Sequence, residues 1–336
     1  MNKLLSFIIF IILILFYSCE NIFFEDVPEN TPESIFKIVW KTIDEKYPFF
    51  EYKRINWDSV KSVYEKRISN NMTEQQLFDV LGDMLFELKD GHVNLLSQFN
   101  RSRNWDWYLI YPPNFNWTII ERNYLRNDYF ISGPLLNQVI DSVGYIYYSS
   151  FSNDISDKNI DFVIDKFAEM KGIIIDIRDN GGGSLDNANK IASHFTDKKY
   201  TAGYMIYKTG PEHDDFGVPI PLEIEPAKKI FQKKVVVLTN RKTYSAANFF
   251  TMYMKQLQNV KIIGDKTGGG GGLPIYYELP NGWILRFSST ITLDINGLNI
   301  ENGIEPDIKA FISTDDEINE KDAIIEKAID YIIKTN

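Results

Sequence analysis

A serine between an apolar strand and an apolar helix is the first residue whose type and position suggest chemistry. Ser245 lies in "VVVLTNRKTYSAANFF", residues 235–250, where three valines and a leucine lead through a polar turn to the serine and two alanines. A hydroxyl at such a strand-to-helix turn lies beside free backbone N–H groups, which suits a nucleophile. The same position also suits an ordinary helix N-cap, the role of most serines that precede an apolar helix.

A run of glycines forms a second candidate site. The stretch "IDIRDNGGGS", residues 175–184, places three glycines between a predicted buried strand and a predicted helix. Glycine amides without side-chain obstruction can cradle an oxyanion or a phosphate. No Gly-Lys-Ser/Thr follows and the glycine spacing does not fit a dinucleotide fingerprint, so a tight turn without a ligand is an equally good interpretation. Asp176, Arg178 and Asn180 are expected to brace this turn rather than to react.

Three histidines are available as bases or metal ligands. His92 lies in "KDGHVNL", where a predicted helix gives way to a β run. His194 falls in a predicted helix and His213 in a polar loop, and both are interpreted as packing or solvent-facing residues. No two of the three share a metal-binding spacing, so we expect neither a metal nor an organic cofactor.

Composition and charge restrict the class of protein. The chain has 336 residues, of which 44% are apolar, and its net charge is −10. A nucleic-acid partner is not expected, because phosphate backbones require a basic surface. The chain is long enough for one large core or two smaller ones.

The N-terminus has the pattern of an export signal. Lys3 precedes an apolar run from Leu4 to Tyr17. This run is shorter than a typical membrane-spanning helix and resembles the hydrophobic region of a secretory signal. Cys19, the only cysteine, lies where a bacterial lipoprotein carries its lipid, although Phe16 departs from the usual leucine. We therefore predict a signal peptide at 1–19, a membrane anchor through lipidated Cys19 and a location in the cell envelope; an uncleaved N-terminal anchor is the alternative.

The rest of the chain is predicted to form a tether and three structural parts. After the tether at 20–33, apolar residues at helical spacing indicate a small helical domain at 34–92. Short aromatic and β-branched runs indicate a β-rich connecting segment at 93–142. From 143 to 336 apolar strands alternate with helices, which indicates α/β layers around a buried sheet. A single helix at 317–334 is expected to end the chain.

Several of these motifs together resemble one family. They occur in the order found in the tail-specific, C-terminal-processing serine peptidases and their tricorn-core relatives, and the similarity covers roughly residues 35–335. The N-terminal "KYPFFEYKRINWDSV" resembles that of bacteroidetal lipoprotein members. The resemblance implies a crotonase/ClpP-like catalytic core at 143–336. The motifs are "DGHV" (90–93), "DIRDNGGG" (176–183), "TNRKTYSAAN" (239–248), "IIGDKTGGGGG" (262–272) and "ENGIEPDI" (301–308).

The resemblance also implies a reaction. Ser245 would be the nucleophile of an exported serine endopeptidase and would form an acyl-enzyme with a peptide or unfolded protein. The oxyanion would be held by the N–H of Ala246 and by that of a glycine in the turn, Gly182 or Gly183. Asp307 would have a structural role in pinning the C-terminal strand.

The two branches of this family differ in the group that takes the serine proton. In the C-terminal-processing branch the base is a lysine whose position aligns with Gly270, and Lys266, four residues earlier, is the alternative base here. In the tricorn-like branch the base is the histidine of the "DGH" segment, assisted by a glutamate, and these residues are His92 and Glu301. We therefore expect His92 to be the general base, with Glu301 bonded to its imidazole directly or through a polar relay.

The chain departs from the family pattern at two further positions. Gly91 replaces the serine that precedes the histidine, and Asn248 replaces an acidic residue three positions after the nucleophile. These departures leave open a catalytically inactive peptide- or lipophile-binding protein of the same fold. An acyl hydrolase that uses the same serine is a further alternative.

The connecting segment is too short for a PDZ domain. Only the residues between His92 and the predicted strand at Val143 are available, so we expect no PDZ domain. The aromatic-rich stretch 105–131 is predicted to form a β platform or a lid instead. The loop 208–220, rich in glycine, proline and aspartate, is a second lid candidate.

Overall fold

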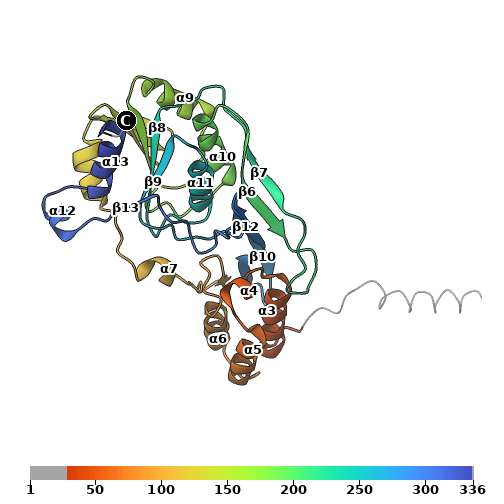
Figure 1. Ribbon diagram of the computed structural model, residues 1–336. Coiled ribbons are helices and arrows are strands. Elements are labelled where there is room, and N and C mark those ends of the chain that lie inside the picture. Colours follow the sequence, from red (N-terminus) through yellow and green to blue (C-terminus); the bar gives the residue numbers. More distant parts are fainter. Residues whose placement is uncertain (1–28, 335–336) are drawn as a thin grey trace, which may run out of the picture.

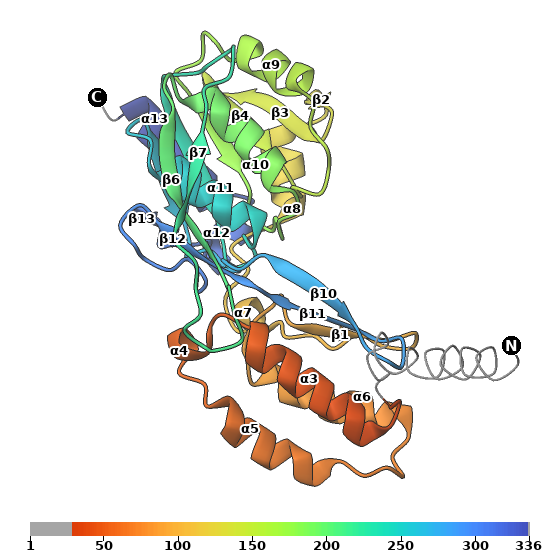
Figure 2. The same ribbon diagram turned by 90° about the vertical axis from the view of Figure 1, so that its right-hand side faces the viewer.

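Residues 29–334 are described by the computed structural model, and they form two lobes that Figures 1 and 2 show from two directions. The predicted signal peptide and the lipid acceptor Cys19 lie outside the described residues. Within 29–334 no helix has both the length and the apolar character needed to cross a membrane.

The N-terminal lobe packs helices against a small antiparallel sheet (Figure 2). Apolar residues of the helices, among them Phe36, Leu81 and Met84, share a core with Leu285 and Phe287 of the sheet. The helices are α3 (Pro32–Lys46), α4 (Phe50–Lys53), α5 (Trp57–Tyr64), η1 (Glu65–Arg67) and α6 (Glu74–Phe86), and the sheet has the order β1 (Asn94–Leu96), β11 (Ile284–Ser288), β10 (Pro274–Glu278). Strands from late in the sequence therefore complete the lobe that the first helices begin.

The α/β lobe is built on a seven-stranded sheet. Within this sheet β4, β5, β8, β9 and β13 pair in parallel, whereas β2, β3 and β4 pair antiparallel. Asp307 accepts a hydrogen bond from Ile262 N–H at 2.8 Å, which pins the short last strand as expected. The strand order is β13 (Ile308–Lys309), β9 (Val260–Gly264), β8 (Lys234–Thr239), β5 (Gly172–Asp176), β4 (Val143–Tyr147), β3 (Leu135–Ile140), β2 (Phe130–Ser132).

Helices cover both faces of this sheet, which confirms the predicted α/β layers. Along β5, Ile173 and Ile175 point into one core and Ile174 into the other, because successive side chains of a strand alternate between faces. One core lies under α9 (Asp157–Lys166), α10 (Leu185–Ala192) with its extension η3 (Ser193–Phe195), and α11 (Ala246–Lys255); the other lies under α8 (Trp117–Ile119), η2 (Ile120–Leu125) and α13 (Ala323–Lys334).

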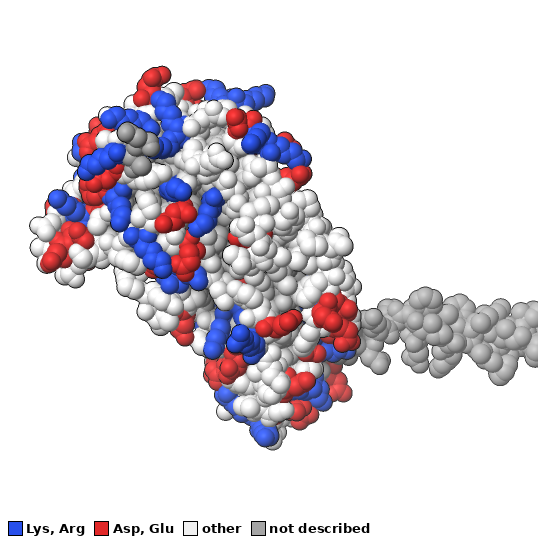
Figure 3. Space-filling view, viewed as in Figure 1, with Lys and Arg blue, Asp and Glu red and all other residues white. Residues whose placement is uncertain are grey.

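A third sheet runs along the side of the molecule. It has the order β12 (Thr290–Asp294), β6 (Tyr200–Tyr207), β7 (Ile220–Ile224). Its strand β12 follows directly on β11, so one stretch of chain passes from the N-terminal lobe into the α/β lobe. Figure 3 shows a largely uncharged area on the side that carries β6 and β7, with acidic and basic side chains interspersed elsewhere on this face.

The prediction of a β-rich segment at 93–142 is only partly correct. The strands β1, β2 and β3 are present, but they belong to two different sheets. The stretch 105–131, expected to be a β platform or a lid, contains the helices α7 (Asp106–Leu109), α8 and η2. Asn116 caps α8 by accepting a hydrogen bond from Ile119 N–H, and Ile120 and Leu125 are fully buried against the central sheet. Tertiary burial has therefore overridden the β propensity of these residues.

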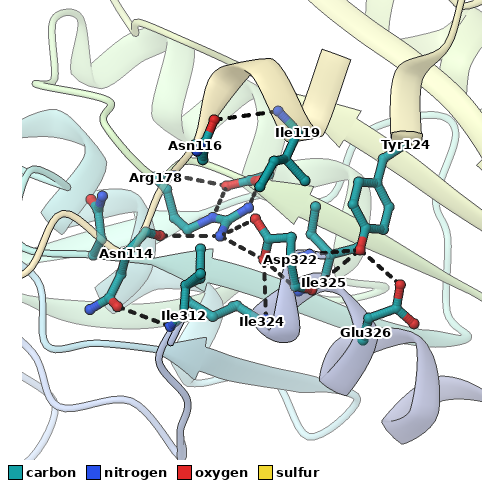
Figure 4. A network of polar contacts seen from close by, with 12 residues as sticks. Asn114, Asn116, Ile119, Tyr124, Arg178, Ile312, Asp322, Ile324, Ile325 and Glu326 are labelled. Carbon is teal, nitrogen blue, oxygen red and sulfur yellow. Dashed lines mark hydrogen bonds and ion pairs between the residues drawn. The ribbon is translucent and has the colours of Figure 1, made fainter. Parts of the chain in front are cut away.

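The expected single helix at 317–334 is also wrong. The structure has α12 (Thr314–Ile318) and α13, with a break at Asp322, whose carboxylate turns inward and is 1% exposed. Figure 4 shows why the helix breaks: Asp322 binds Arg178 at 2.9 Å and caps α13 by accepting from Ile324 N–H and Ile325 N–H. Arg178 also binds Asp176 through two hydrogen bonds of 2.9 and 2.6 Å. Asp176 and Arg178 thus brace the glycine turn, as predicted.

We expect Arg178→Met to destabilise the fold strongly, because it leaves two buried carboxylates without their cation. The loss should be roughly 3–5 kcal/mol in the free energy of unfolding, measured by urea denaturation. Arg122→Met is the matched control: Arg122 forms an exposed ion pair with Glu320, and its loss should cost about 1 kcal/mol or less. Similar losses in the two variants would show that the Arg178 network does not hold the C-terminal helix.

Candidate active site

Ser245 has an unusual backbone conformation immediately before α11. Its φ and ψ are 55° and −124°, a region that costs a non-glycine residue of order 1–3 kcal/mol. Its N–H donates to Gly269 O at 2.9 Å, which ties the serine to the glycine loop. The side chain makes no capping hydrogen bond, so the N-cap interpretation is wrong.

His92 lies against the Ser245 hydroxyl, as expected. Its Nε2 is 3.0 Å from Ser245 Oγ although the two residues are 153 positions apart in the chain. The imidazole is 3% exposed and packs edge-on against the Tyr244 ring, with 4.9 Å between ring centres. Its Nδ1 faces Ser288 Oγ at 3.5 Å, and its backbone N–H donates to Asp90 Oδ1 at 2.8 Å.

The surroundings of His92 keep its imidazole neutral. The pKa of His92 is lowered to about 4, chiefly by burial; Asp90 acts in the opposite direction, and the positive charges of Arg286 and Lys53 contribute to the lowering. At neutral pH the ring is therefore unprotonated and can accept a proton from the serine hydroxyl.

Glu301 does not contact the imidazole directly. Its carboxylate binds Lys53 Nζ at 2.8 Å and accepts from Gly271 N–H at 2.8 Å. Lys53 Nζ lies 4.0 Å from Asp90, so a polar route leads from Glu301 to the loop that carries His92. The pKa of Glu301 is raised to about 7, chiefly by burial and then by the negative charge of the nearby Asp90, while Lys53 opposes the rise.

The alternative base is not at the site. Lys266 pairs with Glu305, with 3.5 Å between Nζ and Oε1. Gly270, which aligns with the lysine of the other branch, has φ +77°, and a Cβ there would lie 2.5 Å from the Tyr244 ring. The Tyr244 ring therefore occupies the space into which a side chain at this position would extend.

Of the predicted oxyanion residues, Gly182 and Ala246 adjoin Ser245, Gly183 follows Gly182 in the chain, and the choice of glycine donor needs a correction. A Cβ on Gly182 would lie 2.7 Å from Ser245 Cβ and 2.8 Å from Ala246 N, so only glycine fits there. The Gly182 N–H, however, already donates to Asn180 Oδ1 at 2.9 Å, which also shows Asn180 bracing the turn. Within residues 29–334, the N–H groups of Gly183 and Ala246 donate to no protein acceptor. Gly183 and Ala246 are therefore the better pair of donors.

The two departures from the family pattern have physical reasons. A Cβ on Gly91 would lie 2.5 Å from Trp107 Nε1 and 2.9 Å from Tyr244 Oη, so no serine fits at this position. Asn248 donates to Ile300 O at 3.0 Å and accepts from Thr267 Oγ1 at 2.6 Å. A carboxylate in place of the amide would lack the donor, so asparagine suits this position.

Sequence reasoning missed several residues that complete the site. Asp90 stands two positions before His92 in a motif already recognised, and its acidic side chain was a signal that could have been used. Lys53 is the single buried cation of the aromatic "KYPFFEYK" stretch, but nothing in the pattern indicates where it points. Ser288 ends an ordinary strand and has no distinguishing sequence signal.

The arrangement can carry out acyl transfer. A hydroxyl bonded to a neutral imidazole is a nucleophile with its base in place, and the amides of Ala246 and Gly183 can receive a developing negative charge.

Two family models match the chain. The model of peptidase family S41 covers residues 142–310, and that of the tricorn protease C1 domain covers residues 28–86. Among curated proteins, a probable CtpA-like serine protease of Staphylococcus aureus is 31% identical over 168 residues, which are 49% of this chain and 33% of the relative. The match therefore spans a third of the length of this relative.

Solved structures share the fold over nearly the whole chain. A Parabacteroides merdae protein, provisionally assigned as a peptidase, is 43% identical with a TM-score of 0.88, covering 92% of this chain and 98% of its own. Mature CPAF in complex with lactacystin has a TM-score of 0.70 at 13% identity, covering 91% of this chain and 99% of its own. The tricorn protease has a TM-score of 0.58 at 17% identity, covering 90% of this chain and 36% of its own. At these low identities the last two show likeness of fold alone.

We expect Gly182→Ala to disable the serine, because the added Cβ displaces Ser245 and the Ala246 N–H. The rate of labelling by a fluorophosphonate should fall roughly a hundredfold. Gly297→Ala is the matched control: Gly297 also has positive φ, +80°, but a Cβ there meets nothing within 4 Å. Gly297→Ala should lose about 1–2 kcal/mol of stability from backbone strain and keep its labelling, whereas Gly182→Ala should lose more stability because of the added clash and should also lose labelling. Equal labelling would contradict the placement of Gly182.

Proposed function

The chain belongs to peptidase family S41, and we propose that it is an exported serine endopeptidase that cleaves peptides or unfolded proteins. The observation that carries this proposal is the 3.0 Å contact between Ser245 Oγ and His92 Nε2, beside two open backbone amides. The strained backbone of Ser245 supports the same role, because such strain is retained where a nucleophile must be presented.

The reaction follows from these contacts. Ser245 Oγ attacks the carbonyl carbon of the scissile bond while its proton passes to His92 Nε2. The carbonyl oxygen becomes an oxyanion held by the N–H groups of Ala246 and Gly183, and each such donor is worth roughly 2.7–4 kcal/mol in the transition state. His92 then returns the proton to the leaving amine, which leaves an acyl-enzyme on Ser245. A water molecule, deprotonated by the same imidazole, hydrolyses the ester.

An extended peptide suits the surroundings of the serine. The glycine loop that binds Ser245 N–H continues directly into β10, the edge strand of its sheet. Edge strands can add an extended peptide through backbone hydrogen bonds, with side chains supplying selectivity. Along β10 the side chains of Ile275, Tyr276 and Tyr277 are exposed. These residues favour an unfolded, partly apolar substrate segment.

The location in the cell envelope rests on the sequence. The apolar run from Leu4 to Tyr17 supports export, and Cys19 supports a lipid anchor in the membrane. An anchored peptidase with a tether at 20–33 would act on proteins of the same compartment.

Covalent labelling tests the proposal. The wild-type protein should react with a fluorophosphonate and cleave casein or a peptide library, and Ser245→Ala should lose both activities. His92→Ala should lose labelling by at least a hundredfold, in the range that general bases contribute. Lys266→Ala is the control lysine variant and should retain most of the activity, because Lys266 pairs with Glu305.

Each alternative has its own outcome in this experiment. A wild type that is not labelled would favour an inactive peptide- or lipophile-binding protein. Labelling with turnover of esters but not of peptides would favour an acyl hydrolase. Loss of activity in Lys266→Ala with retention in His92→Ala would overturn the assignment of the base.

The pH dependence of the labelling rate should reflect the ionisation of Glu301 rather than that of His92. The pKa of Glu301 is about 7, and its ionisation adds a negative charge that favours the imidazolium formed during attack. Labelling should therefore rise with pH through about 7, whereas His92, with a pKa of about 4, is already neutral there. In Glu301→Gln this rise should disappear between pH 5 and 8. Glu305→Gln, an exposed control, should retain it, and retention in Glu301→Gln would contradict this role.

A further inference from the structure

A buried carboxylate beside His92 has no part in the chemistry proposed so far. Asp90 is 1% exposed, and its carboxylate is surrounded by hydrogen-bond donors. Its Oδ1 accepts from His92 N–H at 2.8 Å and from Tyr244 Oη at 3.4 Å, and its Oδ2 accepts from Tyr47 Oη at 3.1 Å and from Ser288 Oγ at 2.9 Å. A carboxylate bonded in this way is held in one orientation.

The Ser288 hydroxyl connects this carboxylate to the imidazole. Ser288 Oγ donates to Asp90, and its remaining lone pairs face His92 Nδ1 at 3.5 Å. Because an ionised carboxylate only accepts, the single hydroxyl proton goes to Asp90, and Nδ1 must carry the ring proton. The Gly272 backbone also accepts from this imidazole. Nε2 is then the unprotonated nitrogen, and it is the one 3.0 Å from Ser245 Oγ.

Glu301 is bound elsewhere. One of its oxygens binds Lys53 Nζ and the other accepts from Gly271 N–H, and the partners found for the ring nitrogens of His92 are Ser245, Ser288 and the Gly272 backbone. Its charge reaches His92 only across Lys53 and Asp90.

We propose that Asp90, acting through the Ser288 hydroxyl, is the carboxylate that positions His92. Glu301 then serves as the counter-ion of Lys53. This assignment rests on the proposed chemistry of Ser245 and adds two positioning residues to it. Ser288 thereby supplies the hydroxyl that Gly91 cannot supply.

Lys53, at the end of helix α4, connects the N-terminal helices to the hydrogen-bond network of Asp90. Its ammonium lies 4.0 Å from Asp90 and donates to Leu88 O at 3.2 Å and Lys89 O at 3.1 Å, the two residues before Asp90 in the chain. Burial acts to raise the pKa of Asp90, but Lys53 and the hydrogen bonds outweigh it and lower this pKa. The carboxylate therefore stays ionised and opposes the positive charges of Lys53 and Arg286 around His92.

Removing one hydroxyl tests the assignment. Ser288→Ala should slow fluorophosphonate labelling roughly ten- to hundredfold, the range for losing a hydrogen bond to a charged group. The rise of the labelling rate with pH near 7 should remain, because Glu301 is not connected to His92 through Ser288. Ser289→Ala is the matched control: Ser289 Oγ donates to Leu273 O, and its removal should leave the rate unchanged. Asp90→Asn should slow labelling at least as much as Ser288→Ala. A cooperative thermal unfolding transition in each variant, as in the wild type, would show that the variant is folded.

The outcomes separate this inference from the proposed function. A wild type without labelling refutes the serine chemistry itself. Labelling of Ser288→Ala at the wild-type rate overturns the positioning role while leaving Ser245 as nucleophile. If the variants do not fold, the ¹⁵N spectrum of wild-type His92 decides: a proton on Nδ1 is required, and a proton on Nε2 overturns the proposal.

Discussion

The contact between the Ser245 hydroxyl and the His92 imidazole joins two lobes that have separate hydrophobic cores. His92 follows the last helix of the N-terminal lobe, and Ser245 begins a helix of the α/β lobe. A hydrogen bond of 3.0 Å tolerates little displacement, so the lobes must be fixed relative to each other. The chain achieves this by running from β11 straight into β12, and by placing Lys53 between both lobes. The site therefore depends on the lobe interface as much as on either lobe.

The charges buried at this interface explain the electrostatics of the site. One cation, Lys53, forms ion pairs with two carboxylates, those of Asp90 and Glu301. Two buried negative charges are not fully compensated by one positive charge, so one carboxylate must have a raised pKa. Asp90 has more hydrogen-bond donors, which keep its pKa low, and Glu301 has the raised value. The same burial keeps His92 neutral and ready to accept a proton.

Close packing around Tyr244 accounts for two of the positions at which the chain departs from its family, Gly91 and Gly270. The ring of Tyr244 lies on Trp107, with 4.1 Å between ring centres, and leaves no space for a Cβ at Gly91 or Gly270. A serine at the first position would thus clash with both Trp107 and Tyr244, and a lysine at the second would clash with Tyr244. In the chemistry proposed above, His92 is then the base, and the hydroxyl beside its Nδ1 comes from another strand, which supplies Ser288.

The sequence by itself determined the α/β layers, the helical N-terminal lobe, the nucleophile candidate and the histidine that meets it, because motif order and the periodicity of apolar residues are local properties. It did not determine the helices within 105–131 or the break at Asp322, since burial against the sheet and a buried Arg178 override local propensity. Only the tertiary structure decided which groups surround His92. Lys53 approaches the neighbouring Asp90 and Ser288 approaches His92 itself, from opposite ends of the chain. A side chain's direction across such distances depends on packing, which no local pattern records.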